Sequence, residues 1–348
     1  MRRDGKVVHV PARQPTVEDV ARLAGVSRQT VSNVLNAPDV VRAPTRARVE
    51  AAIEQLGYAP SMAARRLRTQ RSHTIGIHLD PYAGGISGIV LDRFIHALTD
   101  RATPRGLRIL VYAASDAEEE LRRIRQLREG GEIDRIVLTG TYTGDPRAEW
   151  LAEHEIPFVA FGRPWGDAGA PAPGGAADRP WVDVDGSAGT KAATLHVLAE
   201  GDRVAFLGWP QGSGTGDDRE RGWREAMGFD ARPPADLRWT SIDSVARARA
   251  VCEEAFASGP VDAVVCASDT LALGAHLAAS HSGRPDLAVI GFDNTPVAEA
   301  LGISSVEQRP ELVADAVLDL LAADAVNHSG EWHRLIEPEL VVRARGGQ

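Results

Sequence analysis

The chain has little of what membrane-spanning and secreted proteins carry. It has two cysteines among 348 residues, Cys252 in a helical pattern and Cys266 in an apolar strand pattern, which predicts buried free thiols rather than a disulfide. No run of 18 apolar residues occurs, so we expect no spanning helix. The apolar stretch at residues 7–10 is too short for a signal peptide. We therefore expect a cytoplasmic protein.

Signatures of catalysis, metal binding and cofactor binding are also missing. The histidines are scattered without the spacing of metal ligands, and the sequence offers no convincing Ser-His-Asp or paired-carboxylate grouping. The glycine-rich segment 212–216 lies between a strand pattern and a helix pattern, but it lacks the lysine of a phosphate-binding loop. It predicts a flexible loop at a cleft. We expect no enzyme, no metal and no cofactor.

The charge is unevenly divided along the chain. The net charge is −9, but residues 1–72 carry 13 Lys and Arg against 6 Asp and Glu, while the remainder carries 26 against 42. A basic head on an acidic body indicates that only the head meets nucleic-acid phosphates.

Two short amphipathic helical patterns joined at Gly25 occupy residues 16–36, TVEDVARLAGVSRQTVSNVLN. Thr16 and Asp19 predict a capping box at the first helix, and Ser27 can cap the second. A third apolar face at residues 44–56 covers the pair. The pattern predicts a three-helix helix-turn-helix unit, whose second helix enters a DNA major groove.

The outward positions of the second helix predict the DNA contacts. Arg28 can pair with guanine, and Gln29 and Asn33 with adenine, although some of them could contact only phosphate or solvent. The remaining polar positions of the unit are predicted to bind phosphate or to cap, without carrying sequence information. They are Thr16, Ser27, Thr30, Ser32 and Asn36.

From residue 74 onward, short apolar strands alternate with helical runs, which predicts an α/β core of two doubly wound parallel-sheet lobes. Expected strands are 75–79, 107–111, 136–139, 158–161, 181–184, 203–208, 237–240, 263–268, 287–292, 304–307 and 339–342. A Gly-, Pro- and Ala-rich loop at 164–180 interrupts them. The expected organisation is a disordered leader (1–14), the helix-turn-helix domain (15–60), a hinge helix and linker (61–73) and the core (74–345). Such cores bind small ligands at the carboxyl ends of their strands.

The head and several later segments carry a family resemblance. After residues 16–36 come TRARVEAAIEQLGYAPSMAARRLR, DGSAGTKAATLHVLAEGDRVAFLG, RERGW, VCASDTLALGA, VIGFDN and SVEQRP. In this order they resemble the landmarks of the LacI/GalR family of bacterial transcriptional regulators, over about residues 15–345. The resemblance implies a periplasmic-binding-protein-like core, a homodimer and a small effector that changes operator affinity.

The resemblance also gives the basic segment SMAARRLR at residues 61–68 a role. Leu67 matches the leucine that the family's paired hinge helices insert into the minor groove, Ala64 matches a small residue that allows close approach, and Arg65 suits a phosphate. Ser61 stands where many members have Asn. The alternative is a solvated basic linker.

Further matching positions imply an effector site in the core cleft. They are Phe94, Arg163, Arg219, Trp239, Ser268, Asp269, Asp293 and Gln308. Arginine and aspartate suit vicinal sugar hydroxyls, and the 7 Trp against 4 Tyr favour a saccharide. Ser268 replaces a common Asn. Surface ion pairs for the charged residues and core packing for the tryptophans are the alternatives.

Taken together, these features predict a repressor of carbohydrate-utilisation genes. Its partners would be a palindromic double-stranded operator, a second copy of the chain and a mono- or disaccharide inducer such as a glucoside, with no membrane partner. The alternatives are a regulator that needs a metabolite co-repressor such as a purine, and, much less supported, a sugar-binding receptor or an enzyme. The sequence leaves dimer versus tetramer open.

Overall fold

The computed structural model describes residues 15–58, 72–79, 88–166, 179–230, 233–322 and 332–344. The chain divides into two compact units, Met1–Arg71 and Ser72–Gln348. We describe each unit by itself. Among the described residues, no helix is both long and apolar enough to cross a membrane.

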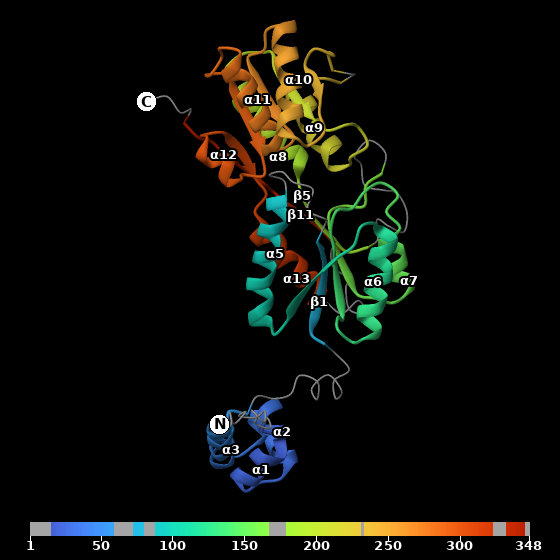
Figure 1. The fold of residues 1–348 in the computed structure, drawn as a ribbon, viewed down its shortest axis with the longest axis vertical. Coiled ribbons are helices and arrows are strands. Elements are labelled where there is room, and N and C mark those ends of the chain that lie inside the picture. Colours follow the sequence, from blue (N-terminus) through green and yellow to red (C-terminus); the bar gives the residue numbers. More distant parts are fainter. Residues whose placement is uncertain are drawn as a thin grey trace, which may run out of the picture. The chain divides into compact units, whose positions relative to one another are not determined.

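The first unit contains the expected three helices, α1 (Val17–Ala24), α2 (Arg28–Asn36) and α3 (Ala43–Leu56), with a short 3-10 turn, η1 (Pro38–Val40) (Figure 1). The predicted capping box is confirmed, because Thr16 and Asp19 each satisfy the other's backbone N–H. Gly25 ends α1 at φ 63°, a conformation that favours glycine. Val20, Val31 and Val49 are fully buried where the helices meet.

Lobe 1 of the second unit is a parallel sheet in the order β11-β5-β4-β3-β1-β2. Its strands are β1 (Thr74–Leu79), β2 (Arg108–Ala113), β3 (Arg135–Leu138), β4 (Phe158–Phe161), β5 (Trp181–Val184) and β11 (His333–Ile336). Helices α5 (Gly88–Ala102) and α13 (Pro310–Ala322) form one apolar core with the sheet, and α6 (Ala117–Glu129) and α7 (Arg147–Glu153) form another. A short 3-10 turn, η2 (Thr103–Arg105), follows α5.

Lobe 2 has the sheet order β12-β10-β9-β8-β6-β7, parallel except for β12, which runs antiparallel to β10. Its strands are β6 (Val204–Gly208), β7 (Arg238–Thr240), β8 (Ala263–Cys266), β9 (Ala288–Phe292), β10 (Ser304–Glu307) and β12 (Glu339–Val341). Its helices are α8 (Gly186–Val197), α9 (Thr215–Met227), α10 (Val245–Ser258), α11 (Asp269–His281) and α12 (Pro296–Ala300) (Figure 1). The expected strands are confirmed to within two residues at each end, and β11 was not expected.

The chain passes from one lobe to the other after β5, after β10 and between β11 and β12. Each crossing starts at the carboxyl end of a strand in one lobe and leads into the other lobe. Residues directly after those strands therefore lie between the lobes. Gly186 lies at the first crossing, where a Cβ atom would lie 2.9 Å from Asp218 Oδ2 and 3.1 Å from Arg219 Cγ. The absence of a side chain there lets α9 approach the crossing.

The expectation of buried free thiols is confirmed for both cysteines. Burial raises the pKa of the Cys252 thiol to about 12 and that of the Cys266 thiol well above its ordinary value. Both therefore act as small apolar core residues.

Candidate DNA-reading helix and effector cleft

Helix α2 presents the predicted base-reading side chains at the surface of the head. The Arg28 side chain is 69% exposed, and its Nη1 lies 3.0 Å from Glu18 Oε1 on α1. Gln29, the next residue of α2, donates through Nε2 to Asn33 Oδ1, one turn further along the helix, at 2.9 Å. Exposed pairs of this kind are weak, so these side chains can exchange their partners for base edges.

The hydroxyl residues at the helix starts have capping roles in the structure. The Thr16 hydroxyl donates to Asp19 Oδ2 at 2.7 Å, and Ser27 Oγ accepts from the Thr30 backbone N–H at 3.1 Å. The Thr30 hydroxyl lies 2.9 Å from Ser27 Oγ. Phosphate contacts by these residues and by half-buried Ser32 remain predictions. The side chains of Asn36, Ala64, Arg65 and Leu67 lie outside the described residues.

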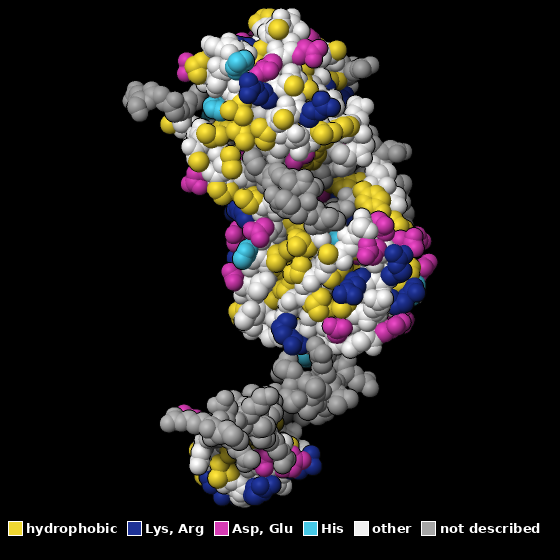
Figure 2. Space-filling view, viewed as in Figure 1, with side chains coloured by type: hydrophobic (Ala, Val, Ile, Leu, Met, Phe, Trp, Pro, Cys, Tyr) yellow, Lys and Arg dark blue, Asp and Glu magenta, His cyan; other side chains and the backbone are white. Residues whose placement is uncertain are grey.

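The basic surplus of the first unit does not come from its folded helices. Residues 15–58 carry five arginines and five acidic residues, so the whole surplus belongs to residues 1–14 and 59–72. Figure 2 shows basic and acidic side chains together on the visible face of this head. The net positive charge of the first unit therefore lies in these flanking segments, whereas the predicted base-reading side chains lie on a helix of balanced charge.

A cavity of about 260 Å³ lies between the two lobes of the second unit. Lobe 1 and lobe 2 both contribute the residues at their strand ends, and the crossings contribute the rest. The lining residues include Val90, Leu91, Thr139, Phe161, Trp165, Asp183, Val184, Gly186, Trp209, Thr215, Asp218, Arg219, Phe292, Asp293 and Gln308. Aromatic rings and apolar chains thus face a small number of charged groups, as in sites for amphipathic ligands.

Arg219 on α9 is the central cation of this cavity, and its side chain is only 6% exposed. Its guanidinium carbon lies 3.7 Å from the centre of the Phe292 ring and 5.4 Å from that of Trp209. Nη1 donates to the Ala267 carbonyl and lies 3.6 Å from Asp293 Oδ1. Among the described residues, Nε is buried without a hydrogen-bond partner.

Asp293 follows β9, and a hydrogen bond holds its carboxyl group at the cavity wall. Gln308 Nε2 donates to its Oδ1 at 2.6 Å. Burial raises the pKa of Asp293 to about 7, although the charge of Arg219 opposes the shift. The carboxyl group is therefore poised between its neutral and ionised forms at physiological pH. Burial also lowers the pKa of Arg219, whose guanidinium nevertheless stays charged.

Arg163 joins the two lobes from behind the cavity wall. Its Nε lies 2.7 Å from Asp183 Oδ2 in lobe 1, and its Nη2 lies 2.7 Å from Asp218 Oδ2 in lobe 2. Burial alone would lower the pKa of Arg163, but the two carboxylates raise it above its ordinary value. The pKa of Asp183 is raised by burial in spite of Arg163. A second ion pair, Arg93 with Glu307 at 2.8 Å, also joins the lobes.

Of the eight predicted effector residues, the structure places Arg219, Asp293 and Gln308 together on the cavity wall. Arg163 lies one layer behind it, through Asp183 and Asp218. Ser268 and Asp269 also lie behind the wall, where they hold cavity residues rather than line the cavity.

Ser268 and Asp269 act from the second layer. Ser268 caps α11 and donates to Asp243 Oδ1 at 2.6 Å, and the same oxygen accepts from Trp209 Nε1 at 3.1 Å. Asp269 accepts from the Thr295 backbone N–H at 2.7 Å, which fixes the loop after Asp293.

Phe94 and Trp239 are core residues. Phe94 is fully buried under Phe161, with ring centres 4.6 Å apart, and Phe161 is the ring that lines the cavity. Trp239 packs edge-on against Phe256 at 5.7 Å, and its Nε1 donates to the Asp236 carbonyl. The tryptophans on the cavity wall are instead Trp165 and Trp209. Both follow strands, which is the one signal in the sequence that marks them.

The described residues hold no group of three or more His, Cys, Asp or Glu side chains that could bind a metal ion. A DNA-reading helical head on a two-lobed core with a small amphipathic cavity defines the class: a DNA-binding regulator whose core takes a small molecule.

Comparisons with known proteins narrow this class. Residues 16–61 match the family described as "Bacterial regulatory proteins, lacI family", and residues 196–344 match the "Periplasmic binding protein-like domain". The HTH-type transcriptional regulator CelR of Thermobifida fusca is 33% identical in an alignment of 356 positions, gaps included. The alignment covers 96% of this chain and 99% of that protein. The ribose operon repressor of Escherichia coli (strain K12) is 26% identical over 93% of this chain and 94% of that protein.

A solved structure described as the transcriptional regulator CelR–cellobiose complex superimposes with a TM-score of 0.65 at 28% identity, covering 95% of this chain and all of that one. The chain belongs to the lacI family of bacterial regulatory proteins. It is a DNA-binding transcriptional regulator with a periplasmic-binding-protein-like core, not an enzyme.

Proposed function

We propose that this regulator is a homodimeric repressor of carbohydrate-utilisation genes that leaves a palindromic operator when a sugar binds the core cleft. The observation that carries the proposal is the trio Arg219, Asp293 and Gln308 on the wall of a partly aromatic cavity between the lobes. A guanidinium donates to vicinal hydroxyl oxygens and a carboxylate accepts from hydroxyls. Relatives named for cellobiose and for a ribose operon support a sugar effector.

The size and charge of the cavity support a small neutral ligand. A volume of about 260 Å³ lies just below the roughly 300–1,000 Å³ of sites for drug-sized ligands, which suits a mono- or disaccharide. Among the described lining residues, Asp183, Asp218 and Asp293 face one cation, Arg219. Because Arg163 pairs with Asp183 and Asp218, the wall carries little net charge, which suits a neutral ligand. The rings of Trp165, Trp209 and Phe292 supply apolar faces for the C–H groups of a pyranose.

Lobe closure gives this site a way to control DNA binding. Arg163 with Asp218 and Arg93 with Glu307 hold lobe 1 against lobe 2. A ligand bound by both lobes stabilises one relative placement of them, and the equilibrium shifts by the difference in affinity between the two states. At the dimer, this shift changes the spacing of the hinge segments 61–73. Leu67 then leaves the minor groove, and the two heads lose their register.

The cytoplasm is the compartment in which we place this function, since the operator is there. Arg28, Gln29 and Asn33 read bases, whereas the hinge residues Ala64, Arg65 and Leu67 bend the operator centre. Thr16, Ser27, Thr30, Ser32 and Asn36 position the helices on phosphates.

A binding panel tests the proposal. Thermal shift and calorimetry are run with glucose, cellobiose, methyl β-glucoside, ribose, glucose 6-phosphate and guanine. We expect a neutral sugar to raise the melting temperature and to release a palindromic operator in a gel-shift titration. Binding of guanine alone, or a sugar that tightens operator binding, would contradict the inducer mechanism. Arg219→Lys serves as the matched control, because it keeps the charge but loses the planar donor pair.

A further inference from the structure

The turn after β9, which carries Asp293, has a strained backbone. Asp293 has a φ of 108° and Asn294 a φ of 48°. Positive φ is uncommon for residues other than glycine, and 108° lies well outside the left-handed region at about 57° that Asn and Asp tolerate. Such a backbone persists only where its surroundings hold it, so the contacts of this turn determine how firmly Asp293 is placed.

The backbone N–H groups of the turn are bound within lobe 2. The Asn294 N–H donates to Ser305 Oγ at 2.9 Å, and the Thr295 N–H donates to Asp269 Oδ2 at 2.7 Å. The Asn294 side chain adds a bond from Nδ2 to Glu307 Oε2 at 2.9 Å. Lobe 2 therefore satisfies these donors from its own residues.

The carbonyl oxygens of the turn accept from lobe 1. Arg93 on α5 donates through Nη1 to the Asp293 carbonyl at 3.2 Å, and the Asn294 carbonyl lies 3.5 Å from the same atom. The Arg93 Nη2 donates to Glu307 Oε2 at 2.8 Å. Burial alone would raise the pKa of Glu307, but hydrogen bonds from Arg93 and Asn294 lower it below its ordinary value. One guanidinium thus binds the backbone of the turn and an ionised side chain beside it, both in the other lobe.

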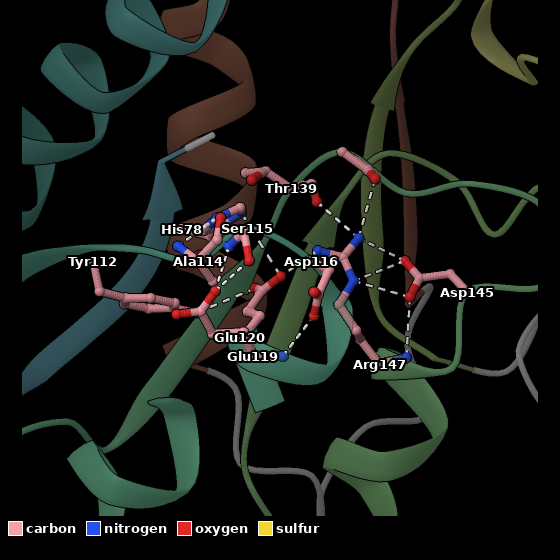
Figure 3. Close-up of polar contacts among 11 residues, drawn as sticks. His78, Tyr112, Ala114, Ser115, Asp116, Glu119, Glu120, Thr139, Asp145 and Arg147 are labelled. Atoms are coloured by element: carbon pink, nitrogen blue, oxygen red, sulfur yellow. Dashed lines mark hydrogen bonds and ion pairs between the residues drawn. The ribbon is translucent and has the colours of Figure 1, made fainter. Parts of the chain in front are cut away.

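A second arginine, Arg147, holds a loop in the same way but within one lobe (Figure 3). Its Nη2 donates to the carbonyl oxygens of the two residues that follow β3, at 3.1 Å and 3.0 Å. The guanidinium is also bound by Glu120 and Asp145, each at 2.7 Å. All these partners belong to lobe 1, so the loop after β3 is held independently of lobe 2. The turn after β9 lacks this independence, because its arginine comes from the opposite lobe.

We infer that Arg93 is a positioning residue of the effector site: it holds the strained turn that carries Asp293, and it does so only while the two lobes are together. When lobe 1 moves away from lobe 2, Arg93 leaves the turn, and the carbonyl oxygens exchange it for water. The strained turn then keeps only the contacts of lobe 2, and the Asp293 carboxyl group is held less firmly. The contact itself is a property of the chain alone, whereas its effect on a ligand rests on the proposed sugar effector.

This arrangement makes the effector site depend on the placement of the lobes without any contact between Arg93 and a ligand. Arg93 is not among the described residues that line the cavity. A ligand that binds Asp293 binds best to the state in which the turn is held, so it favours that placement of the lobes. Removal of the Arg93 guanidinium would lower the fraction of protein in this state and would weaken every ligand that uses Asp293.

Hydrogen exchange on the full-length protein without ligand tests the contact itself. We expect the amides of Asn294 and Thr295 to exchange about tenfold faster in Arg93→Met, because lobe 1 no longer holds the turn. Arg101→Met is the matched control, since Arg101 lies on the same helix, is 31% exposed like Arg93 and pairs with Asp315 within lobe 1. Exchange at the turn should be unchanged in this control. Equal exchange in Arg93→Met and the unsubstituted protein would overturn the inference.

Glu307→Gln supplies a second variant, because it keeps the size of the side chain and removes its charge. It should also speed the exchange at Asn294 and Thr295. Combining it with Arg93→Met should add little, since both substitutions break one contact. Additive increases in exchange would show that Arg93 and Glu307 act separately and would overturn the assignment.

Calorimetry with glucose, cellobiose and methyl β-glucoside tests the effect on the effector site. The best-bound sugar should bind about fivefold more weakly to Arg93→Met, and its affinity for Arg101→Met should stay within about twofold of that for the unsubstituted protein. Unchanged affinity together with faster exchange would overturn the positioning role. If none of the sugars binds the unsubstituted protein, the proposed sugar effector is overturned, and the exchange measurement still decides whether Arg93 holds the turn.

Discussion

Two arginine–carboxylate pairs show how differently the head and the core use the same chemistry. Arg28 and Glu18 lie 3.0 Å apart at the surface of the head, with side chains 69% and 44% exposed. Arg219 and Asp293 lie 3.6 Å apart in the cleft, with side chains 6% and 5% exposed. Water competes for the first pair and is nearly excluded from the second.

The difference determines what each pair can do. An exposed pair contributes about 0–1 kcal/mol, so Arg28 can leave Glu18 for a guanine at little cost. A buried pair cannot separate without leaving a charge unsolvated. Arg219 and Asp293 therefore keep their positions in the cleft, where a ligand can form hydrogen bonds with them.

The largest expected effect comes from breaking the buried pair. Arg219→Ala leaves Asp293 buried without its counter-charge and should weaken sugar binding on the order of 100-fold. Operator binding by the untreated protein should persist, which also shows that the variant folds. Calorimetry and a gel shift on the same preparation measure the two properties. Unchanged sugar affinity would rule out Arg219 as a ligand contact.

Breaking the exposed pair should affect the other function. Arg28→Ala would remove the proposed bidentate base contact, for which about 1–3 kcal/mol is typical, so operator affinity should fall roughly 10- to 100-fold with sugar binding unchanged. Fluorescence anisotropy with a labelled operator measures the loss. Arg22→Ala on α1 is the control, because its side chain is 78% exposed but lies outside the reading helix. An equal loss in both variants would mean that Arg28 contacts only phosphate.

A pH series distinguishes the two regions without mutation. With the pKa of Asp293 near 7, its carboxylate form, which accepts ligand hydroxyls, predominates above that pH and is lost below it. Sugar affinity should thus fall about tenfold between pH 8 and pH 6. Arg219, Gln308, Asp269 and Asp243 surround this carboxyl group.

Asp293→Asn is the control for the pH series, since it should give weak binding with a flat profile. Calorimetry in buffers of matched ionic strength supplies the measurement. A profile that stays flat in the unsubstituted protein would show that Asp293 does not change its charge in the cleft.

The smallest effects should separate two tryptophans of the same lobe. Trp209 lies on the cavity wall, and Trp209→Phe removes the hydrogen bond from its indole N–H to Asp243. Sugar affinity should fall several-fold, as expected for the loss of one hydrogen bond. Trp239→Phe loses only core packing and the bond to the Asp236 carbonyl, so it should lower the melting temperature and leave affinity unchanged. The opposite pattern would place the ligand against β7.

These two tryptophans also show how far the sequence predicts the site. Helical periodicity and caps predict α1, α2 and their turn at Gly25 because those signals are local. The ends of parallel strands predict where a cleft lies. Which side chain at a strand end faces the cleft depends on the twist and packing of a distant lobe, so the sequence alone does not distinguish Trp239 in the core from Trp209 and Trp165 on the wall.

The second layer of the site is the part that the sequence does not reveal. Ser268 and Asp269 end a strand as expected, yet their oxygens hold Asp243 and the loop after Asp293. Arg93 belongs to no motif and becomes notable only because its guanidinium reaches the turn after β9 in the other lobe. Such information is tertiary: it depends on which donors and acceptors meet when the two lobes pack.

Coupling between the cleft and the operator tests the central claim most directly. The full-length protein is titrated onto a fluorescent palindromic operator with and without saturating sugar, and the sugar affinity is then measured with and without operator. We expect the sugar to weaken operator binding, and the operator to weaken sugar binding by the same factor, because linkage is reciprocal. In Arg219→Ala both effects should vanish. Operator affinity that is unaffected by a sugar bound in the cleft would contradict the claim.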